Sequence, residues 1–365
     1  MTVRIAKPSV NIREKLAELE RPIGLNGQAL LATETPQQAF DLLGAGRRNL
    51  VINGDFKISQ RGDYSSATAA SHSTYYLDRW KTDISGPSAT IQRQTVTLPD
   101  NSQTYSAKLA ATSTVSNGYL QLQQFVEIFP YMQGRTVTMS VWVRSNRQVR
   151  LRMESTTGNL DGSTAHSGSG NWEYITQTFT LGTGLSLLKF GVILWNSSGG
   201  TTATATGSNI TSGDYLEFAN YQVEFGKVAT PFEYRSIGEE LALCQRYYER
   251  WTGTGSIVWY TGYGYATQLY LWLPYKVPKR TSPSGTGAVV SYSSATPNVL
   301  FNAYGTGSAS GLIGPLMNSS PFVVASTNTD LSFYINLSAS TYTPYGTAVL
   351  WGITNNNWID ISSEL

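Results

Sequence analysis

The sequence predicts a mainly β protein, with a short N-terminal helical segment followed by a jelly-roll β-sandwich and a second, smaller C-terminal β-sandwich. Apolar residues follow a helical spacing up to about residue 48 and again at 237–250, and the other later segments alternate apolar and polar residues with a period of two. Turns rich in Gly, Ser and Asn separate these alternating segments. No blade-length repeat occurs in the sequence, which favours a jelly roll over a propeller.

The composition limits the classes of partner. The 365 residues carry 26 Lys and Arg against 24 Asp and Glu, and a net charge of +2 attracts a polyanion only weakly. We therefore expect no nucleic-acid partner. The sequence has no apolar run long enough to span a membrane and no signal-peptide core after Met1, so we expect no membrane insertion and synthesis in the cytoplasm without a signal peptide.

Residues 1–48 are predicted to form a helical attachment and oligomerisation segment. The apolar residues have the spacing of a short coiled-coil seam, at Ile5, Ile12, Leu16, Leu19 and Ile23. A helix this short is marginal on its own in water, so it needs a partner. That partner is either another copy of the segment, which predicts a homo-oligomer, or the body of its own chain.

Residues 49–236 are predicted to form the jelly-roll sandwich. Residues 49–62 indicate a short strand that leads into a turn at Asn53-Gly54-Asp55, because Gly and short polar side chains favour turns. Alternating apolar residues predict half-buried antiparallel strands at 136–144, 149–154 and 188–194. The stretches 158–170 and 197–213 are predicted to be loops. Asp78 and Arg79, just before Trp80, are predicted to form an internal ion pair.

Residues 237–250 are predicted to form a helical linker. Ile237, Leu241, Cys244 and Tyr248 have the spacing of one buried helix face. Cys244 is the single cysteine, which excludes an intramolecular disulfide. The two histidines, His72 and His166, both lie in Ser-rich stretches away from it, so we expect Cys244 to act as a small buried hydrophobe.

Residues 251–365 are predicted to form the C-terminal sandwich, with strands at 268–274 and 347–353. This region has few charges and many aromatic residues. Trp259, Tyr263 and Tyr265 have the same parity on a predicted strand. They suit two roles, a strip of rings that stacks on sugars or an interface between protomers.

The sequence predicts no enzymatic activity. A glycosidase needs two carboxylates beside a cleft, and no such pair of acids stands out. The sequence also contains no phosphate-binding Gly-Lys-Ser loop and no Cys/His metal cluster.

Several short motifs in a fixed order carry a resemblance. They are NLVINGDF at 49–56, QRG at 60–62, LDRW at 77–80, QVEFG at 222–226 and ATPFEY at 229–234. In this order they resemble a module found in many bacteriophage tail-fibre and virion structural proteins, which is similar to the jelly rolls of carbohydrate-binding modules. The resemblance implies a homotrimeric tail fibre of the virion that attaches to other virion proteins through its N-terminus and adsorbs to a host-surface glycan. A capsid or head fibre, a decoration protein and a free carbohydrate-binding protein are the alternatives.

The same resemblance implies one structural ion and no other cofactor. Carbohydrate-binding jelly rolls often hold a structural Ca²⁺ between an acidic residue near such a turn and another on the last strand. The implied ligands are Asp55 with Glu224 or Glu217, since hard oxygen ligands suit Ca²⁺. A hydrogen-bonded turn without metal explains the same residues.

Overall fold

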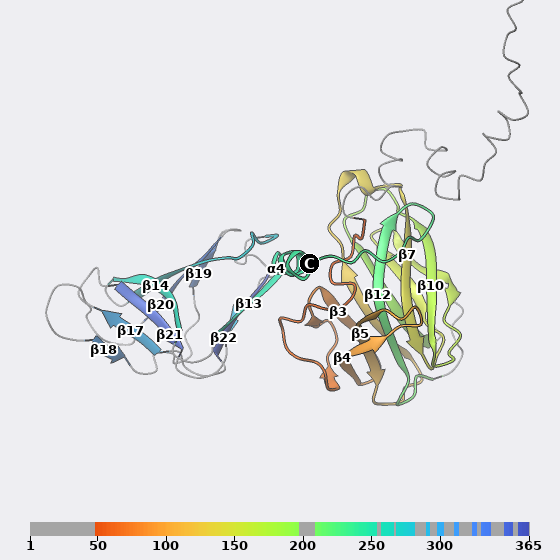
Figure 1. The fold of residues 1–365 in the computed structure, drawn as a ribbon, viewed down its shortest axis with the longest axis horizontal. Helices are drawn as coiled ribbons and strands as arrows, with labels where there is room; N and C mark the ends of the chain where they lie inside the picture. The colour runs from red at the N-terminus through yellow and green to blue at the C-terminus, as the bar shows by residue number, and fades with distance from the viewer. Residues whose placement is uncertain are drawn as a thin grey trace, which may run out of the picture.

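The computed structural model describes residues 48–196, 209–253, 257–265, 268–281, 290–292, 298–302, 310–313, 323–326, 330–336, 347–352 and 357–364. It is mainly β, as predicted, and its first part is a sandwich of two six-stranded antiparallel sheets (Figure 1). The predicted helical segment 1–48 lies outside the described residues except for Arg48. Within the described part, no helix is both long enough and apolar enough to cross a membrane.

The sandwich consists of a β12 sheet and a β11 sheet, each called after one of its central strands. The β12 sheet contains, in spatial order, β1 (Thr68–Ala70), β4 (Ala89–Thr97), β5 (Gln103–Ala111), β12 (Tyr215–Phe225), β7 (Thr136–Ser145) and β10 (Trp172–Thr180). The β11 sheet contains β2 (Tyr75–Leu77), β3 (Trp80–Ser85), β6 (Gly118–Phe125), β11 (Leu188–Asn196), β8 (Arg150–Ser155) and β9 (Gly158–Ala165). A short 3₁₀ turn, η1 (Pro130–Met132), precedes β7.

The hydrophobic core lies between the two sheets, because the apolar residues that alternate along the strands face inward. Strands β7, β8 and β11 confirm the three predicted strands, and their apolar residues are buried. Trp80 lies at the centre, fully buried, with its ring about 5 Å from those of Phe56, Phe218 and Tyr221. Its indole N–H donates to the Asn53 carbonyl at 2.8 Å. Each buried side chain of this size contributes roughly 1.5–3 kcal/mol to folding.

The predicted strand within residues 49–62 is wrong, because this segment is irregular although it is buried. Strand β12 takes up some of its backbone groups, since the Leu50 N–H donates to the Val223 carbonyl at 2.8 Å and the Gly54 carbonyl accepts the Tyr221 N–H at 2.9 Å, and side chains take up others. The Ile52 N–H donates to the Gln124 side-chain oxygen at 2.8 Å, and the Gln124 amide donates back to the Ile52 carbonyl at 2.7 Å. The predicted turn is confirmed at Gly54, where a β-carbon would lie 2.1 Å from the Tyr221 carbonyl oxygen. Only glycine allows that approach.

The predicted loop at 158–170 is also partly wrong, since 158–165 form strand β9, which pairs antiparallel with β8. This strand lies at the edge of its sheet and most of its side chains are exposed, so it lacks the apolar alternation of a half-buried strand. In the second predicted loop, 197–213, residues 197–208 lie outside the described residues.

The linker helix is shorter than predicted, and of its predicted buried face Leu241, Cys244 and Tyr248 are at least partly buried whereas Ile237 is not. Helix α4 (Ile237–Gln245) begins after Ser236, whose side chain accepts the Glu239 N–H, and the chain enters β13 at Tyr248. Ile237, predicted to be buried, is 68% exposed, whereas Glu240 is buried. Glu240 is tolerated there because it accepts the Asn53 N–H and pairs with Arg235.

Cys244 is buried, as predicted. It packs in a small cluster with Ile52, Ile58 and Tyr247. Burial, the largest influence, raises the pKa of its thiol well above the ordinary value, so the thiol stays protonated near neutral pH.

The C-terminal part is also formed of strands. One sheet contains, in spatial order, β13 (Tyr248–Gly253), β22 (Asn357–Ser362) and β16 (Val290–Tyr292). The other sheet contains, in spatial order, β18 (Ser310–Ile313), β17 (Asn298–Asn302), β21 (Thr347–Gly352), β14 (Ile257–Tyr265), β15 (Gln268–Pro274), β20 (Asp330–Asn336) and β19 (Val323–Ser326). Strands β15 and β21 confirm the two strands predicted here.

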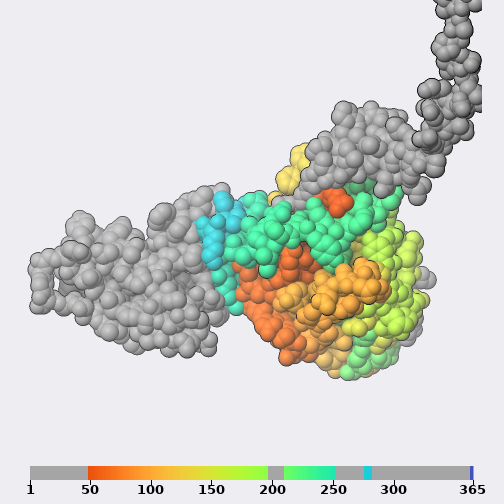
Figure 2. Space-filling view, viewed as in Figure 1, coloured from red at the N-terminus to blue at the C-terminus, as the bar shows by residue number. Residues whose placement is uncertain are grey.

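Buried ion pairs join the sandwich to this C-terminal part. Arg79 and Arg61 both pair with Glu364, and their guanidinium groups lie over the rings of Tyr247 and Tyr248. The predicted ion pair of Asp78 with Arg79 is therefore wrong, because Arg79 binds Glu364 and the Asp78 carboxylate accepts from the backbone and side chain of Gln60. In the space-filling view the segment after β12 (green) lies against residues 275–281 (cyan), where the Arg280 N–H donates to the Arg246 carbonyl at 2.9 Å (Figure 2).

Candidate functional site

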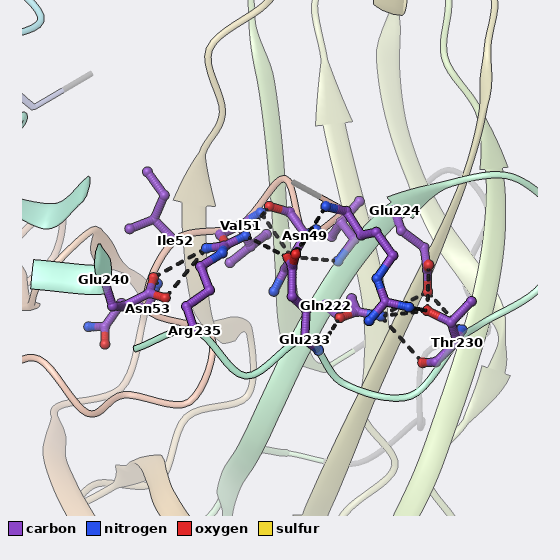
Figure 3. A network of polar contacts seen from close by, with 12 residues as sticks. Asn49, Val51, Ile52, Asn53, Gln222, Glu224, Thr230, Glu233, Arg235 and Glu240 are labelled. Carbon is purple, nitrogen blue, oxygen red and sulfur yellow. Dashed lines mark hydrogen bonds and ion pairs between the residues drawn. The ribbon is translucent and has the colours of Figure 1, made fainter. Parts of the chain in front are cut away.

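Residues 49–53 at the start of the sandwich and residues 222–240 at its end meet in a polar network (Figure 3). The Asn49 side chain donates to the Tyr221 carbonyl at 3.0 Å and accepts the Val223 N–H at 3.1 Å, both on β12. Glu233 accepts the Asn49 N–H at 2.8 Å and pairs with Arg235 at 3.0 Å. Burial acts to raise the pKa of Glu233, but these bonds outweigh it and the net pKa is lowered. Most polar groups of the network are paired within it, although the Arg235 Nε is buried without a hydrogen-bond partner among the described residues, and this is the pattern of a structural clasp.

The carboxylates expected to hold Ca²⁺ each have other partners. Asp55 pairs with Lys57 at 3.0 Å. Glu224 accepts the backbone N–H and hydroxyl of Thr230 at 2.8 and 2.7 Å, and Glu217 pairs with Arg144 at 2.7 Å. Among the residues whose positions are described, no three His, Cys, Asp or Glu side chains are grouped as metal ligands. The Ca²⁺ site stays a prediction.

The predicted aromatic strip lies on β14, at Trp259, Tyr263 and Tyr265. Their side chains lie outside the described part of the chain. The pairing of β14 with β21 shifts register between Val258 and Tyr260, so Trp259 falls at an irregularity in the ladder. The roles suggested for this strip stay predictions.

A different polar surface lies on the outer side of the β11 sheet. Phe190, Val192 and Leu194 of β11 are buried in the core, so the residues between them point outward. We call the β11 face the set of outward residues of β3, β6, β11 and β8, together with Asp161 of β9. Strand register aligns these residues in four rows across the sheet. The first row is Tyr119 and Trp195, and the second is Asp83, Gln121, Ile193 and Arg150. The third row is Lys81, Gln123, Gly191, Arg152 and Asp161, and the fourth is Phe125, Lys189 and Glu154.

Hydrogen bonds link these rows into one network. The Tyr119 hydroxyl donates to Asp83 at 2.9 Å, and the Gln123 amide donates to the other Asp83 oxygen at 3.2 Å. The Gln121 amide nitrogen is shared between Gln123 and Glu154, both at 2.9 Å. Because every bond joins different strands or alternate residues of one strand, the side chains are held in fixed positions.

Two ion pairs complete the network at its far side. Lys189 pairs with Glu154 at 2.9 Å, and the Arg152 guanidinium lies 2.8 Å from an oxygen of Asp161. Burial raises the pKa of Asp161 in spite of the opposing charge of Arg152. Burial, followed by the Asp83 charge, raises the pKa of the Tyr119 hydroxyl to about 12, so this hydroxyl remains a proton donor.

Burial of the polar groups distinguishes this face from an ordinary solvated sheet surface. Gln121 is 1% and Gln123 2% exposed, and Arg152 and Glu154 are also buried. Polar side chains on the outer side of a sheet are usually solvated. The Gln121 side-chain oxygen is buried and has no hydrogen-bond donor in the described part of the protein. A buried acceptor without a donor is uncommon and is expected to take one from water or a ligand.

Aromatic rings lie at one end of the face. The rings of Tyr119 and Trp195 are 6.0 Å apart and tilted by 53°, and both side chains are half-buried. The Arg152 guanidinium lies 4.6 Å from the Trp195 ring. Rings beside fixed amides and carboxylates combine an apolar stacking surface with hydrogen-bonding groups.

This face was not predicted from the sequence. Its signal is present in 119–125 (YLQLQQF), where Gln121 and Gln123 occupy the outward positions between Leu120, Leu122 and Gln124. The amides alone resemble an ordinary solvated strand. Their partners come from β3 and β8, which only the folded topology brings together.

No protein-family model matches the chain, and no curated protein matches it. Solved structures give weak likenesses. One is the enzymatically active domain of tailspike protein 4 from bacteriophage CBA120, with 12% identity and a TM-score of 0.31; the match covers 49% of this chain and 21% of that one.

Two others are carbohydrate-binding modules. TmCBM61, solved with β-1,4-galactotriose, has 12% identity and a TM-score of 0.29, and the match covers 49% of this chain and 99% of that one. The CBM22-1 xylan-binding domain of Paenibacillus barcinonensis Xyn10C has 9% identity and a TM-score of 0.27, and the match covers 46% of this chain and 99% of that one. At these scores the likenesses carry no argument about what this chain binds.

Proposed function

We propose that this chain is a glycan-binding structural protein of a bacteriophage virion, and that its β11 face binds the glycan. The observation that carries the binding proposal is the buried network of Gln121, Gln123 and Glu154 beside the rings of Tyr119 and Trp195. Amides and carboxylates offer both donors and acceptors to sugar hydroxyls, while rings stack on the apolar faces of sugars. The Gln121 oxygen is buried and has no donor among the described residues, so in this proposal it accepts a ligand hydroxyl after neighbouring side chains move aside.

The role in the virion rests on the sequence. The ordered motifs from NLVINGDF to ATPFEY resemble those of phage tail-fibre proteins. In this proposal the chain is a homotrimeric tail fibre that attaches through residues 1–48 and adsorbs to a host-surface glycan without cleaving it. A capsid fibre uses the same binding face, so the glycan proposal does not depend on where the fibre is attached.

Titration against a panel of oligosaccharides tests the binding proposal. Trp195→Ala removes one ring of the face, and Trp142→Ala is the matched control, because Trp142 packs 5.2 Å from Tyr174 on the outer side of the β12 sheet. Loss of a stacking ring is expected to weaken binding by about 1–3 kcal/mol, taking nucleobase stacking as a rough analogue. Equal affinities of the two folded variants for the bound sugar would contradict the proposal.

A further inference from the structure

The charges on the β11 face are not balanced by one another. Each of its three carboxylates has partners on the protein: Asp83 accepts from Tyr119 and Gln123, Glu154 pairs with Lys189, and Asp161 pairs with Arg152. One further cation of the face forms no ion pair with any of these carboxylates in the described part of the chain, although the charge of Asp83 acts on it through space.

Lys81 is that further cation. It is half-buried on β3, and within the described part of the chain its ammonium group has no hydrogen bond and no ion pair. Its contacts are with rings, at 5.2 Å from the centre of Phe125 and 5.6 Å from that of Tyr75. Glu364, an acid near this end of the sheet, is already bound by Arg79 and Arg61.

A second ammonium group lies beside the same ring. Lys189 is 4.8 Å from the centre of Phe125, its direct partner across the strands. Burial, and then the charge of Lys189, lowers the pKa of Lys81, as expected for two cations that share a site. Such a pair is stabilised by an anion placed between or above the two groups.

We propose that the glycan bound by the β11 face is acidic, and that Lys81 and Lys189 bind its carboxylate, sulfate or phosphate group at Phe125. This inference rests on the proposed glycan-binding function. The neutral part of the sugar lies against Gln121, Gln123 and the rings of Tyr119 and Trp195, while the acidic group supplies the counterion that Lys81 lacks. The two parts of the site lie on one sheet face, where Lys81 is the direct cross-strand neighbour of Gln123 and Lys189 that of Phe125.

Paired polysaccharides test this inference. The probes are polygalacturonate, alginate and hyaluronan with their carboxyl-reduced counterparts, and heparin with its desulfated form. The full-length protein is expected to bind at least one acidic member more tightly than its neutral counterpart. Hydrogen bonds to charged groups are stronger than those between neutral groups, so Lys81→Gln is expected to weaken binding of the acidic polysaccharide about tenfold or more. Lys81→Arg is expected to retain most of the affinity, and Lys81→Gln to weaken binding of the acidic member more than binding of its neutral counterpart.

Lys108→Gln is the matched control, since Lys108 lies over the Tyr215 ring at 4.4 Å on the β12 sheet. Circular dichroism and melting establish that each variant folds. The inference is overturned if the protein binds acidic and neutral polysaccharides equally, or if folded Lys81→Gln keeps its affinity for the acidic one. In either case, a loss of neutral binding in Trp195→Ala would still support the glycan proposal. Failure to bind any acidic member overturns the inference, and failure to bind any member of either kind overturns both.

Discussion

Arg79 and Glu364 form a buried ion pair that joins the first β-sandwich to the end of the last described strand. Arg79 also donates to the Phe125 carbonyl and stacks on Tyr247, so its charge is held by groups from three segments. Strand β3 begins one residue later and carries Lys81. The contact between the two parts of the chain therefore lies next to the proposed acidic end of the β11 face.

Loss of the Glu364 charge is expected to destabilise the protein. In Glu364→Gln the guanidinium of Arg79 is left buried without its counterion, which typically costs about 3–5 kcal/mol. Urea unfolding gives the free energy of unfolding. Asp63→Asn, the same change at an exposed residue, is expected to shift it by less than about 0.5 kcal/mol. A Glu364→Gln protein as stable as this control would show that the junction does not depend on the pair.

Gly54 is predicted to be essential for the clasp at the start of the sandwich. A β-carbon there would lie 2.1 Å from the Tyr221 carbonyl oxygen, so Gly54→Ala must displace backbone and is expected to cost more than about 2 kcal/mol. Gly238→Ala in α4 is the control, because nothing lies within 4 Å of its β-carbon and alanine favours a helix by about 0.5–1 kcal/mol. Thermal melts in which Gly54→Ala matches the wild type would refute the close approach.

The stability of the protein is expected to depend on pH through Glu240. Burial raises the pKa of this carboxyl above its ordinary value of 4.5, even though Asn53 and Arg235 oppose the shift. The folded state then binds the proton more tightly than the unfolded state, so the carboxyl's contribution to stability falls as pH rises from 4.5 through the raised pKa. Glu240→Gln does not titrate, and the wild type is expected to lose stability relative to it across that window.

Unfolding free energies measured at several pH values between about 4 and 7 check this sign. Glu239→Gln is the neighbouring control on the exposed side of α4. A wild type that gains stability relative to Glu240→Gln as pH rises through the window would mean that the ion pair with Arg235 outweighs burial.

The full-length protein is predicted to be a homotrimer. The Ile-containing seam in residues 1–48 and the resemblance to tail fibres motivate this prediction. Light scattering coupled to size-exclusion chromatography is expected to give three times the chain mass of 39.9 kDa. A monomer mass at micromolar concentration would contradict it.

The sandwich core was predictable because each strand carries its own pattern. Val137, Met139, Val141 and Val143 alternate along one segment, and the period of two alone places them on one face. Strand β9 was hidden because an edge strand with exposed Gly, Ser and Asn carries no such pattern. The buried face of the helix was predicted except at its start, where Ile237 is exposed and Glu240 is buried in contact with Arg235, which apolar spacing does not reveal.

The β11 face was not predictable for a related reason. Asp83, Gln121 and Glu154 are far apart in the sequence, and each looks like an ordinary exposed polar residue on its own strand. Their meeting depends on the strand order β3, β6, β11, β8, in which the order in space differs from the order in sequence. Sequence analysis instead favoured the aromatic-rich β14, where local composition gives a stronger signal.

A structure of the full-length protein with a bound oligosaccharide from the glycan panel shows which surface binds the sugar. We predict that the sugar lies on the β11 face, with a ring against Trp195 or Tyr119 and hydroxyls bonded to Gln121, Gln123 or Glu154. A sugar bound at Trp259, Tyr263 and Tyr265 on β14, or on the outer side of the β12 sheet, with the β11 face empty, would contradict it.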